Sequence, residues 1–228
     1  YKGEVGLDGA TLKKGLKQVA ESKVNSDYRY QNIKQQAGFS AEIHYVNKEN
    51  ADSIINKTNR TIYRSNDIGR GNDPKFDVLS IDENGDPTWG AQMKFCGKFS
   101  TQKEINDSAK FIADRLASDK WERYRGNSVL VPSEQYKAAK KYALKTSENY
   151  YNQAQRCRQE GNIEKAQMLE ERAVRYQQVS KDLTDSGISS KEAIFLREYP
   201  KLATAKYVIR TAHQSGMENA KSAAILSM

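Results

Sequence analysis

The sequence predicts an α/β fold with a core over about residues 30–132, in the order helix, three strands, helix, strand, and an all-helical extension after it. Two strand-like runs flank the pair Asn84-Gly85, which favours the tight turn of a β-hairpin. An amphipathic helical pattern and then a short apolar run, typical of a buried strand, follow the hairpin. Beyond that run every pattern is helical, so we divide the chain into an α/β domain at 1–132 and an extension at 133–228.

The individual elements follow from local patterns. A weakly amphipathic segment near the N-terminus predicts a peripheral helix, and the next helix has Ala37, Ala41 and Tyr45 at helical spacing. A polar loop rich in Gly and Asn separates the first two strands. In the extension, Gly161-Asn162 predicts the turn of an αα-hairpin. The predicted ranges are helix 28–57, strands 61–64, 75–81 and 89–95, helix 101–121, strand 127–132, and helices 134–160 and 163–183.

Charge and composition narrow the functional classes. The chain has 228 residues, a formal net charge of +8 and a pI near 9.3, which favours an acidic partner such as nucleic acid. Its mean hydropathy is −0.85 and no stretch is apolar enough to span a membrane, so we expect no membrane contact. The two histidines and two cysteines argue against zinc ribbons, His-metal nucleases and Ser-His-Asp hydrolases.

Cysteine content and the chain ends bear on context. Two cysteines cannot make a disulfide framework, which indicates a reducing compartment, and we expect the protein to act in the cytoplasm. The chain begins at Tyr1 without a Met and stops within a helical pattern, so we expect a fragment of a longer protein. A separate expectation is that the protein is delivered into a cell or phage-encoded.

The third predicted strand carries two polar residues, Gln92 and Lys94. Because side chains alternate along a strand, these two share the face opposite the apolar set. A turn centred between Asn84 and Gly85 pairs Gln92 with Asp77 of the preceding strand and leaves Lys94 diagonal to it. A carboxylate, an amide oxygen and an ammonium together can hold a hard divalent cation and stabilise charge on a phosphate. The alternative interpretation is a cross-strand ion pair on a solvated face.

With these residues in place, the chain resembles the PD-(D/E)XK nuclease superfamily over about residues 30–132. The resemblance rests on the order helix, three strands, helix, strand, on Asp77 in the second strand and on Gln92-Met93-Lys94 in the third. It implies a restriction-endonuclease-like core and a metal-dependent hydrolase that cleaves phosphodiester bonds, with Mg²⁺ or Mn²⁺ as cofactor.

The resemblance also implies a role for each site residue. Asp77 and Gln92 would be the metal ligands, Lys94 would lie at the attacking water, and Glu42 on the first helix would contact the metal directly or through water. All four would be catalytic. The chain has Gln92 where the superfamily usually has a carboxylate, and its Pro-Asp pair is absent, which makes Asp73 a rival ligand.

We expect contacts with the phosphate backbone at two further places. One is the loop that enters the Asp77 strand, where basic and amide groups can donate to a phosphate, or where Asn and Gly serve only the turn conformation. The other is a basic stripe on the first helix of the extension, for which a solvated helix face is the alternative. The residues are Arg70, Asn72 and Lys75 in the loop, and Lys137, Lys140, Lys141 and Lys145 on the helix.

The functional expectation is therefore a metal-dependent nuclease in a restriction, defence or toxin context. DNA is favoured over RNA by the habits of the superfamily. Two alternatives stay open: a toxin nuclease that cleaves tRNA or other RNA, and a non-catalytic nucleic-acid-binding or assembly protein. The helical extension is the expected surface for a protein partner.

Overall fold

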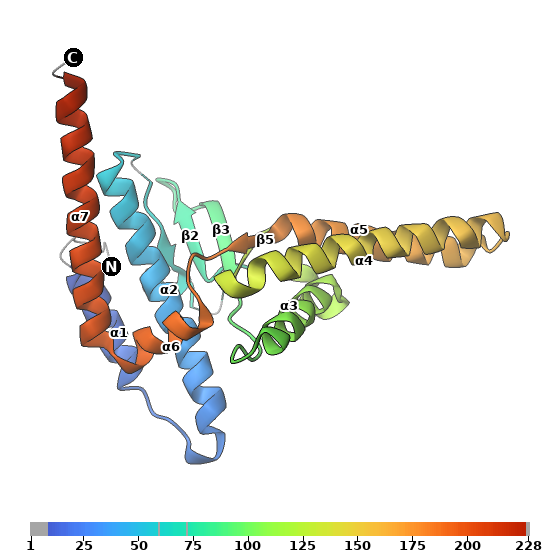
Figure 1. Ribbon diagram of the computed structural model, residues 1–228, viewed down its shortest axis with the longest axis horizontal. Coiled ribbons are helices and arrows are strands. Elements are labelled where there is room, and N and C mark those ends of the chain that lie inside the picture. Colours follow the sequence, from blue (N-terminus) through green and yellow to red (C-terminus); the bar gives the residue numbers. More distant parts are fainter. Residues whose placement is uncertain (1–8, 59, 72, 227–228) are drawn as a thin grey trace. The chain divides into compact units, whose positions relative to one another are not determined.

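The computed structural model of the chain describes residues 9–58, 60–71 and 73–226 (Figure 1). These residues form two compact units. Unit 1 comprises the chain up to Gly90 together with the chain from Lys191 onward, and unit 2 comprises Ala91–Ser190. The predicted boundary at Pro132 differs from this division, because a helical pattern identifies helices but not the core that each helix completes.

Five strands form a mixed sheet in the order β1-β2-β3-β4-β5. β2 is antiparallel to β1, whereas β4 is parallel to both β3 and β5. The α/β class predicted from the sequence is thus confirmed. The strands are β1 (Tyr63–Arg64), β2 (Val78–Ile81), β3 (Pro87–Met93), β4 (Ser128–Val131) and β5 (Leu183–Asp185).

Unit 1 is built around one long helix, α2. Eight consecutive residues of α2, Ser40–Asn47, are buried, so the helix is covered on all sides there and shows little amphipathic pattern. Figure 1 shows α1 and α7 beside α2. The Tyr207 hydroxyl on α7 donates to the Asn47 carbonyl of α2 at 2.9 Å. The helices of unit 1 are α1 (Ala10–Ala20), α2 (Arg29–Ile55), α6 (Ser190–Glu198) and α7 (Pro200–Leu226).

Unit 2 combines the end of β3 with β4, β5 and three helices. α3 begins at a cap in which the Thr101 hydroxyl accepts from the Glu104 amide at 3.2 Å and the Glu104 carboxylate accepts from the Ser100 amide at 3.0 Å. Its apolar face packs on α4, α5 and β4 in one core, which includes Ile112, Leu116 and Val129. The helices are α3 (Gln102–Ala117), α4 (Ser133–Gln159) and α5 (Ile163–Asp182), with a 3₁₀ segment η3 (Asp119–Tyr124).

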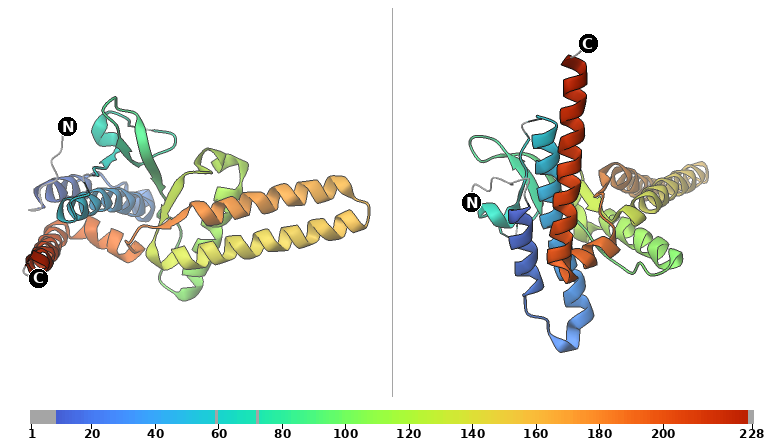
Figure 2. Two further views of the ribbon diagram at one scale, coloured as in Figure 1. Left: turned by 90° about the horizontal axis from the view of Figure 1, so that it is seen from above. Right: turned by 60° about the vertical axis from the view of Figure 1, so that its left-hand side comes forward.

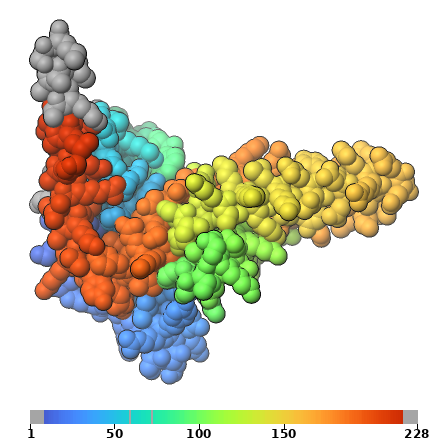
Figure 3. All heavy atoms as spheres, in the orientation of Figure 1, coloured from blue at the N-terminus to red at the C-terminus, as the bar shows by residue number. Residues whose placement is uncertain are grey.

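The predicted αα-hairpin is confirmed in α4 and α5 (Figure 2). Gly161, with φ of 77°, makes the turn, and the Asn162 side chain caps α5 by accepting from the Lys165 amide. On the face seen in Figure 3, the outer part of the hairpin extends beyond α3. That part has a small core of its own, formed by Ala154, Cys157, Ala166 and Leu169.

The expectation that everything after Pro132 is helical is wrong at β5. α5 ends at Asp182, and the buried Leu183 then lies opposite Val129 of β4. The segment continues along β4, where the Ser186 amide donates to the Val131 carbonyl at 3.1 Å. A strand of only three residues is too short to show an alternating pattern, so its pairing partner decides its conformation.

Candidate functional site

Glu42 is held within unit 1 by an ion pair with Arg64. The Glu42 side chain is 11% exposed, and its carboxylate lies 3.5 Å from Nε of Arg64 on β1. Arg64 in turn pairs with Val78, the residue that follows Asp77. Arg64 thus contacts Glu42 through its side chain and lies opposite the residue next to Asp77 through its backbone. Sequence analysis missed Arg64, whose signal was only a basic residue at the end of a short apolar strand.

Asp77 lies immediately before β2, not inside a strand that begins at residue 75. The strand starts late because the Asp73 carboxylate accepts from the backbone amides of Lys75 at 2.8 Å and Phe76 at 2.9 Å, which turns the chain. Asp77 is half-buried, and its carbonyl accepts from the Ser65 amide at 2.9 Å. The rival ligand Asp73 thus serves the turn that positions Asp77.

The turn between β2 and β3 is longer than the two-residue turn expected from Asn84-Gly85. The Asp82 amide donates to the Asp86 carbonyl at 2.9 Å, and the Gly85 amide donates to the Asp82 carbonyl at 3.1 Å. The turn is therefore centred on Asn84 and not between Asn84 and Gly85. The Asp82 side chain causes this, because it accepts from the amides of Asn84 and Asp86. The pairing of Asp77 with Gln92 stays a prediction.

Gln92 lies on β3, opposite Val129 of β4, and is 4% exposed. Its neighbours Ala91 and Met93 are buried as well, so this end of β3 is covered on both faces. The alternative in which Gln92 decorates a solvated face is wrong. A buried amide must be hydrogen-bonded or bind a ligand, which gives Gln92 a specific role in this strand.

Lys94 follows β3, and aromatic rings of η3 surround its ammonium group. The Lys94 amide donates to the Leu130 carbonyl at 2.9 Å, which extends the parallel pairing past the end of the strand. Its Nζ lies 4.8 Å from the ring centroid of Tyr124 and 5.8 Å from that of Trp121. Cation–π contacts of this kind restrain the side chain without neutralising its charge. Sequence analysis missed both rings, since only the fold brings residues 121 and 124 to Lys94.

The loop residues expected to meet a phosphate have mixed roles. Arg70 donates from Nη2 to the Gly85 carbonyl at 2.8 Å and so fastens the loop to the β2–β3 turn. Lys75 is exposed. Asn72 lies outside the described residues.

The basic stripe on α4 is present on the surface of unit 2. Lys137, Lys141 and Lys145 are exposed at successive helical turns. Lys140 is half-buried at the edge of the stripe, with its Nζ 3.3 Å from the Tyr136 hydroxyl and 5.6 Å from the Tyr136 ring centroid. Three of the four lysines thus present their charge to solvent, as a phosphate-binding face requires.

His44, two residues from Glu42 on α2, is buried. It is 6% exposed and packs edge-on against Tyr207. Burial, with further contributions from Arg210 and Lys48, lowers the pKa of His44 to about 4, so the imidazole is neutral at pH 7. A neutral buried imidazole of this kind serves packing in unit 1.

The predicted metal ligands are chemically suited to a hard cation. Asp77 supplies a half-buried carboxylate and Gln92 a buried amide oxygen, and Mg²⁺ takes such oxygens together with several waters. No group of three or more His, Cys, Asp or Glu side chains gathers in the described part of the chain. That finding does not bear on the predicted pair, which contains only one such residue.

No protein-family model, no curated protein and no solved structure matches this chain. Among the helices of the described residues, none has the length and apolar character that a membrane crossing requires.

Proposed function

We propose that the protein is a metal-dependent nuclease that hydrolyses phosphodiester bonds of nucleic acid, with DNA as the favoured substrate. The observation that carries the proposal is the order of elements. α2, β1, β2, β3, α3 and β4 follow one another as helix, three strands, helix and strand, with β4 parallel to β3. That order agrees with the nuclease core expected from the sequence, and DNA is favoured only by the resemblance to the PD-(D/E)XK superfamily.

The residues that support this function differ in their tasks. Asp77 and Gln92 would hold Mg²⁺, which supplies a Lewis acid for the phosphate and lowers the pKa of a bound water. The Lys94 ammonium lies near the rings of Trp121 and Tyr124, and an ammonium can stabilise the negative charge that builds on a phosphate under attack. In the reaction, water adds its oxygen to phosphorus and loses a proton, while one ester oxygen departs and takes up a proton.

One observation favours the non-catalytic alternative. Arg64 lies 3.5 Å from the Glu42 carboxylate and so already supplies the positive charge that a cation would otherwise bring there. A protein built in this way can bind nucleic acid through its exposed lysines without cleaving it.

Comparing cleavage by the parent protein and by Lys94→Ala distinguishes a nuclease from a non-catalytic nucleic-acid-binding protein. Plasmid DNA, single-stranded DNA and tRNA are incubated with purified protein and Mg²⁺ or Mn²⁺. We expect DNA cleavage, lowered by at least about a hundred-fold in Lys94→Ala, because removing one preorganised electrostatic group costs that much in other enzymes. Lys98→Ala is the matched control, since Lys98 is exposed on the loop that follows Lys94.

The outcomes assign the function. Equal cleavage by Lys94→Ala and the parent protein would remove Lys94 from the site. Cleavage of tRNA alone would make the protein an RNA nuclease. If a folded protein leaves all three substrates intact with both metals, the nuclease proposal fails and the non-catalytic alternative replaces it.

A further inference from the structure

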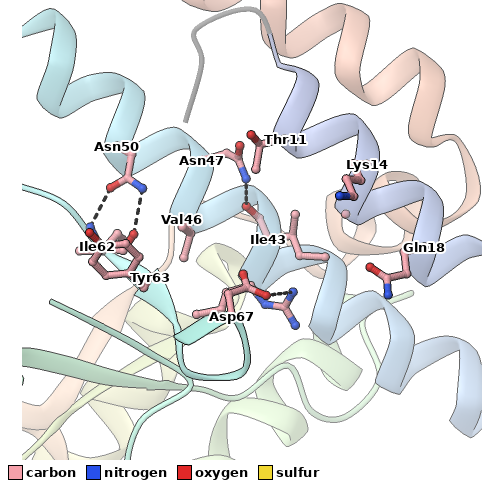
Figure 4. Close-up of a pocket in the computed structure, with 12 residues that line it drawn as sticks. Thr11, Lys14, Gln18, Ile43, Val46, Asn47, Asn50, Ile62, Tyr63 and Asp67 are labelled. Carbon is pink, nitrogen blue, oxygen red and sulfur yellow. Dashed lines mark hydrogen bonds and ion pairs between the residues drawn. The ribbon is translucent and has the colours of Figure 1, made fainter. Parts of the chain in front are cut away.

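A pocket of about 280 Å³ lies within unit 1, and Asp77, Gln92 and Lys94 do not line it (Figure 4). One face of α1, one face of α2 and the segment from Ile62 to Asp67 form its walls. α1 approaches α2 closely through Gly15, since a Cβ atom there would lie 2.9 Å from Cγ2 of Ile43. Both Gly15 and Ile43 line the pocket.

The inner wall of the pocket is apolar except for two asparagines of α2. Ile43, Val46 and Ile62 are buried there. Asn50 is fully engaged, because its amide donates to the Ile62 carbonyl at 2.9 Å and accepts from the Ile62 amide at 2.8 Å. Its polar atoms therefore serve the fold.

In contrast to Asn50, only one of the two polar side-chain atoms of Asn47 is hydrogen-bonded among the described residues. Its Nδ2 donates to the Ile43 carbonyl at 2.8 Å, whereas its Oδ1 has no hydrogen-bond partner among the described residues. Asn47 is 3% exposed, and Figure 4 shows its oxygen pointing away from Ile43, on the side of Thr11. A buried acceptor without a donor costs free energy, so the site favours a ligand that brings an N–H or O–H group to this atom.

The outer wall of the pocket carries charge. Lys14 is exposed at the rim and forms no ion pair with any described residue, so its ammonium is available to an anion. Arg64 also lines the pocket, but its guanidinium is shared between Glu42 at 3.5 Å and Asp67 at 3.6 Å. Lys14 is thus the group that selects an anionic substituent.

We infer that the pocket binds one nucleotide. Its apolar walls accept a flat heterocycle, Asn47 Oδ1 accepts from a ring or exocyclic N–H of the base, and Lys14 meets the phosphate. The volume agrees, because pockets for larger ligands reach roughly 300–1,000 Å³ and this one holds about 280 Å³, enough for one base and part of its sugar. The same chemistry is offered by a free nucleotide and by one nucleotide of a strand. The inference stands independently of cleavage, since it uses none of Asp77, Gln92 or Lys94.

Calorimetric titration without divalent metal tests the inference, because cleavage plays no part under that condition. The ligands are the common nucleoside 5′-monophosphates, the matching nucleosides and a short single-stranded oligonucleotide. We expect saturable binding of at least one monophosphate. Asn47→Ala should weaken both monophosphate and nucleoside by about ten-fold or more through loss of the buried acceptor. Lys14→Gln should weaken the monophosphate alone.

Lys13→Gln is the matched control, because Lys13 is the exposed neighbour of Lys14 on α1 and does not line the pocket. It should bind like the parent protein. Should Asn47→Ala fail to fold, which thermal melting followed by circular dichroism would show, Lys14→Gln still decides the outcome. Oligonucleotide binding that is tighter and equally sensitive to Lys14→Gln assigns the site to a strand, and weaker binding assigns it to free nucleotides. No saturable binding of any ligand, or equal binding by the Lys14 and Lys13 variants, overturns the inference.

Discussion

Two pairs of neighbouring helices in this protein are built in opposite ways. In unit 2, α4 and α5 meet through small residues, and Ala139, Ala143 and Ala173 are fully buried. The Ser147 hydroxyl of α4 donates to the Ala173 carbonyl of α5 at 2.8 Å within this surface. In unit 1, α1 and α2 approach closely at Gly15, and residues of both helices, buried amides among them, line a pocket.

The difference shows two ways of fixing a helix pair. The α4–α5 hairpin is specified by shape, because alanine allows a close approach and leaves almost nothing that needs a hydrogen bond. α2 is specified by polar partners, because Glu42, His44, Asn47 and Asn50 are buried and each carries groups that water can no longer satisfy. We therefore expect α2 to be sensitive to lost hydrogen bonds and the hairpin to added volume.

The largest effect is expected at Asn50. Asn50→Ala removes both hydrogen bonds to Ile62 and leaves its buried amide and carbonyl without partners, which should lower the free energy of unfolding by about 2–5 kcal/mol. Urea denaturation at pH 7 measures this change in the free energy of unfolding. Asn149→Ala, at an exposed position of α4, is the control and should change stability by less than about 0.5 kcal/mol. Similar losses in both variants would contradict the specification of α2 by polar partners.

A pH dependence of somewhat smaller size is expected from His44. Burial lowers its folded pKa from 6.5 to about 4, so the unfolded chain takes up a proton that the folded chain does not. The folded state therefore loses stability as the pH falls from 6.5 toward 4, by on the order of 2–3 kcal/mol from this group. Urea midpoints across this range should show the loss in the parent protein and in His213→Gln but not in His44→Gln. An unchanged slope in His44→Gln would show that His44 titrates normally.

The smallest effect concerns the hairpin. Ala173→Leu adds volume where α5 meets α4 and should lower the free energy of unfolding by about 1–3 kcal/mol. Gln153→Leu adds a similar side chain at an exposed position of α4, so its effect should stay within about 0.5 kcal/mol. Thermal or urea denaturation compares the two. If Ala173→Leu is tolerated as well as Gln153→Leu, close packing does not specify this pair.

Elements set by a local sequence pattern were predicted, whereas elements set by a distant partner were not. The hairpin was predicted to within a residue or two at its ends, because its apolar positions recur at helical spacing and Gly161-Asn162 marks its turn. The first core helix was also found, over 28–57 against the observed Arg29–Ile55. What the sequence did not predict was the late start of β2, the three-residue β5 and the return of α6 and α7 to unit 1. Each depends on a partner distant in the sequence or on an aspartate side chain bonded to the backbone.

For the candidate site, the sequence indicated which residues to consider but not which side chains surround them. It selected Gln92, which is buried on β3, and Lys94, which is half-buried and follows the end of that strand. It did not predict Arg64 beside Glu42, or the aromatic rings beside Lys94, because contacts between elements leave no local pattern. A turn governed by the Asp82 side chain likewise escaped a rule based on Asn-Gly alone.

The division of the chain has a consequence for its synthesis. Unit 1 is discontinuous, and Ala91–Ser190 are made between its two parts. During translation, α1 and α2 therefore wait without α7 while unit 2 is produced, for on the order of 5–20 s at ordinary elongation rates. Unit 2 can fold as a continuous stretch during that interval. The groups that later meet α7, among them the Asn47 carbonyl that accepts from Tyr207, stay open to solvent or chaperones until α7 has been synthesised.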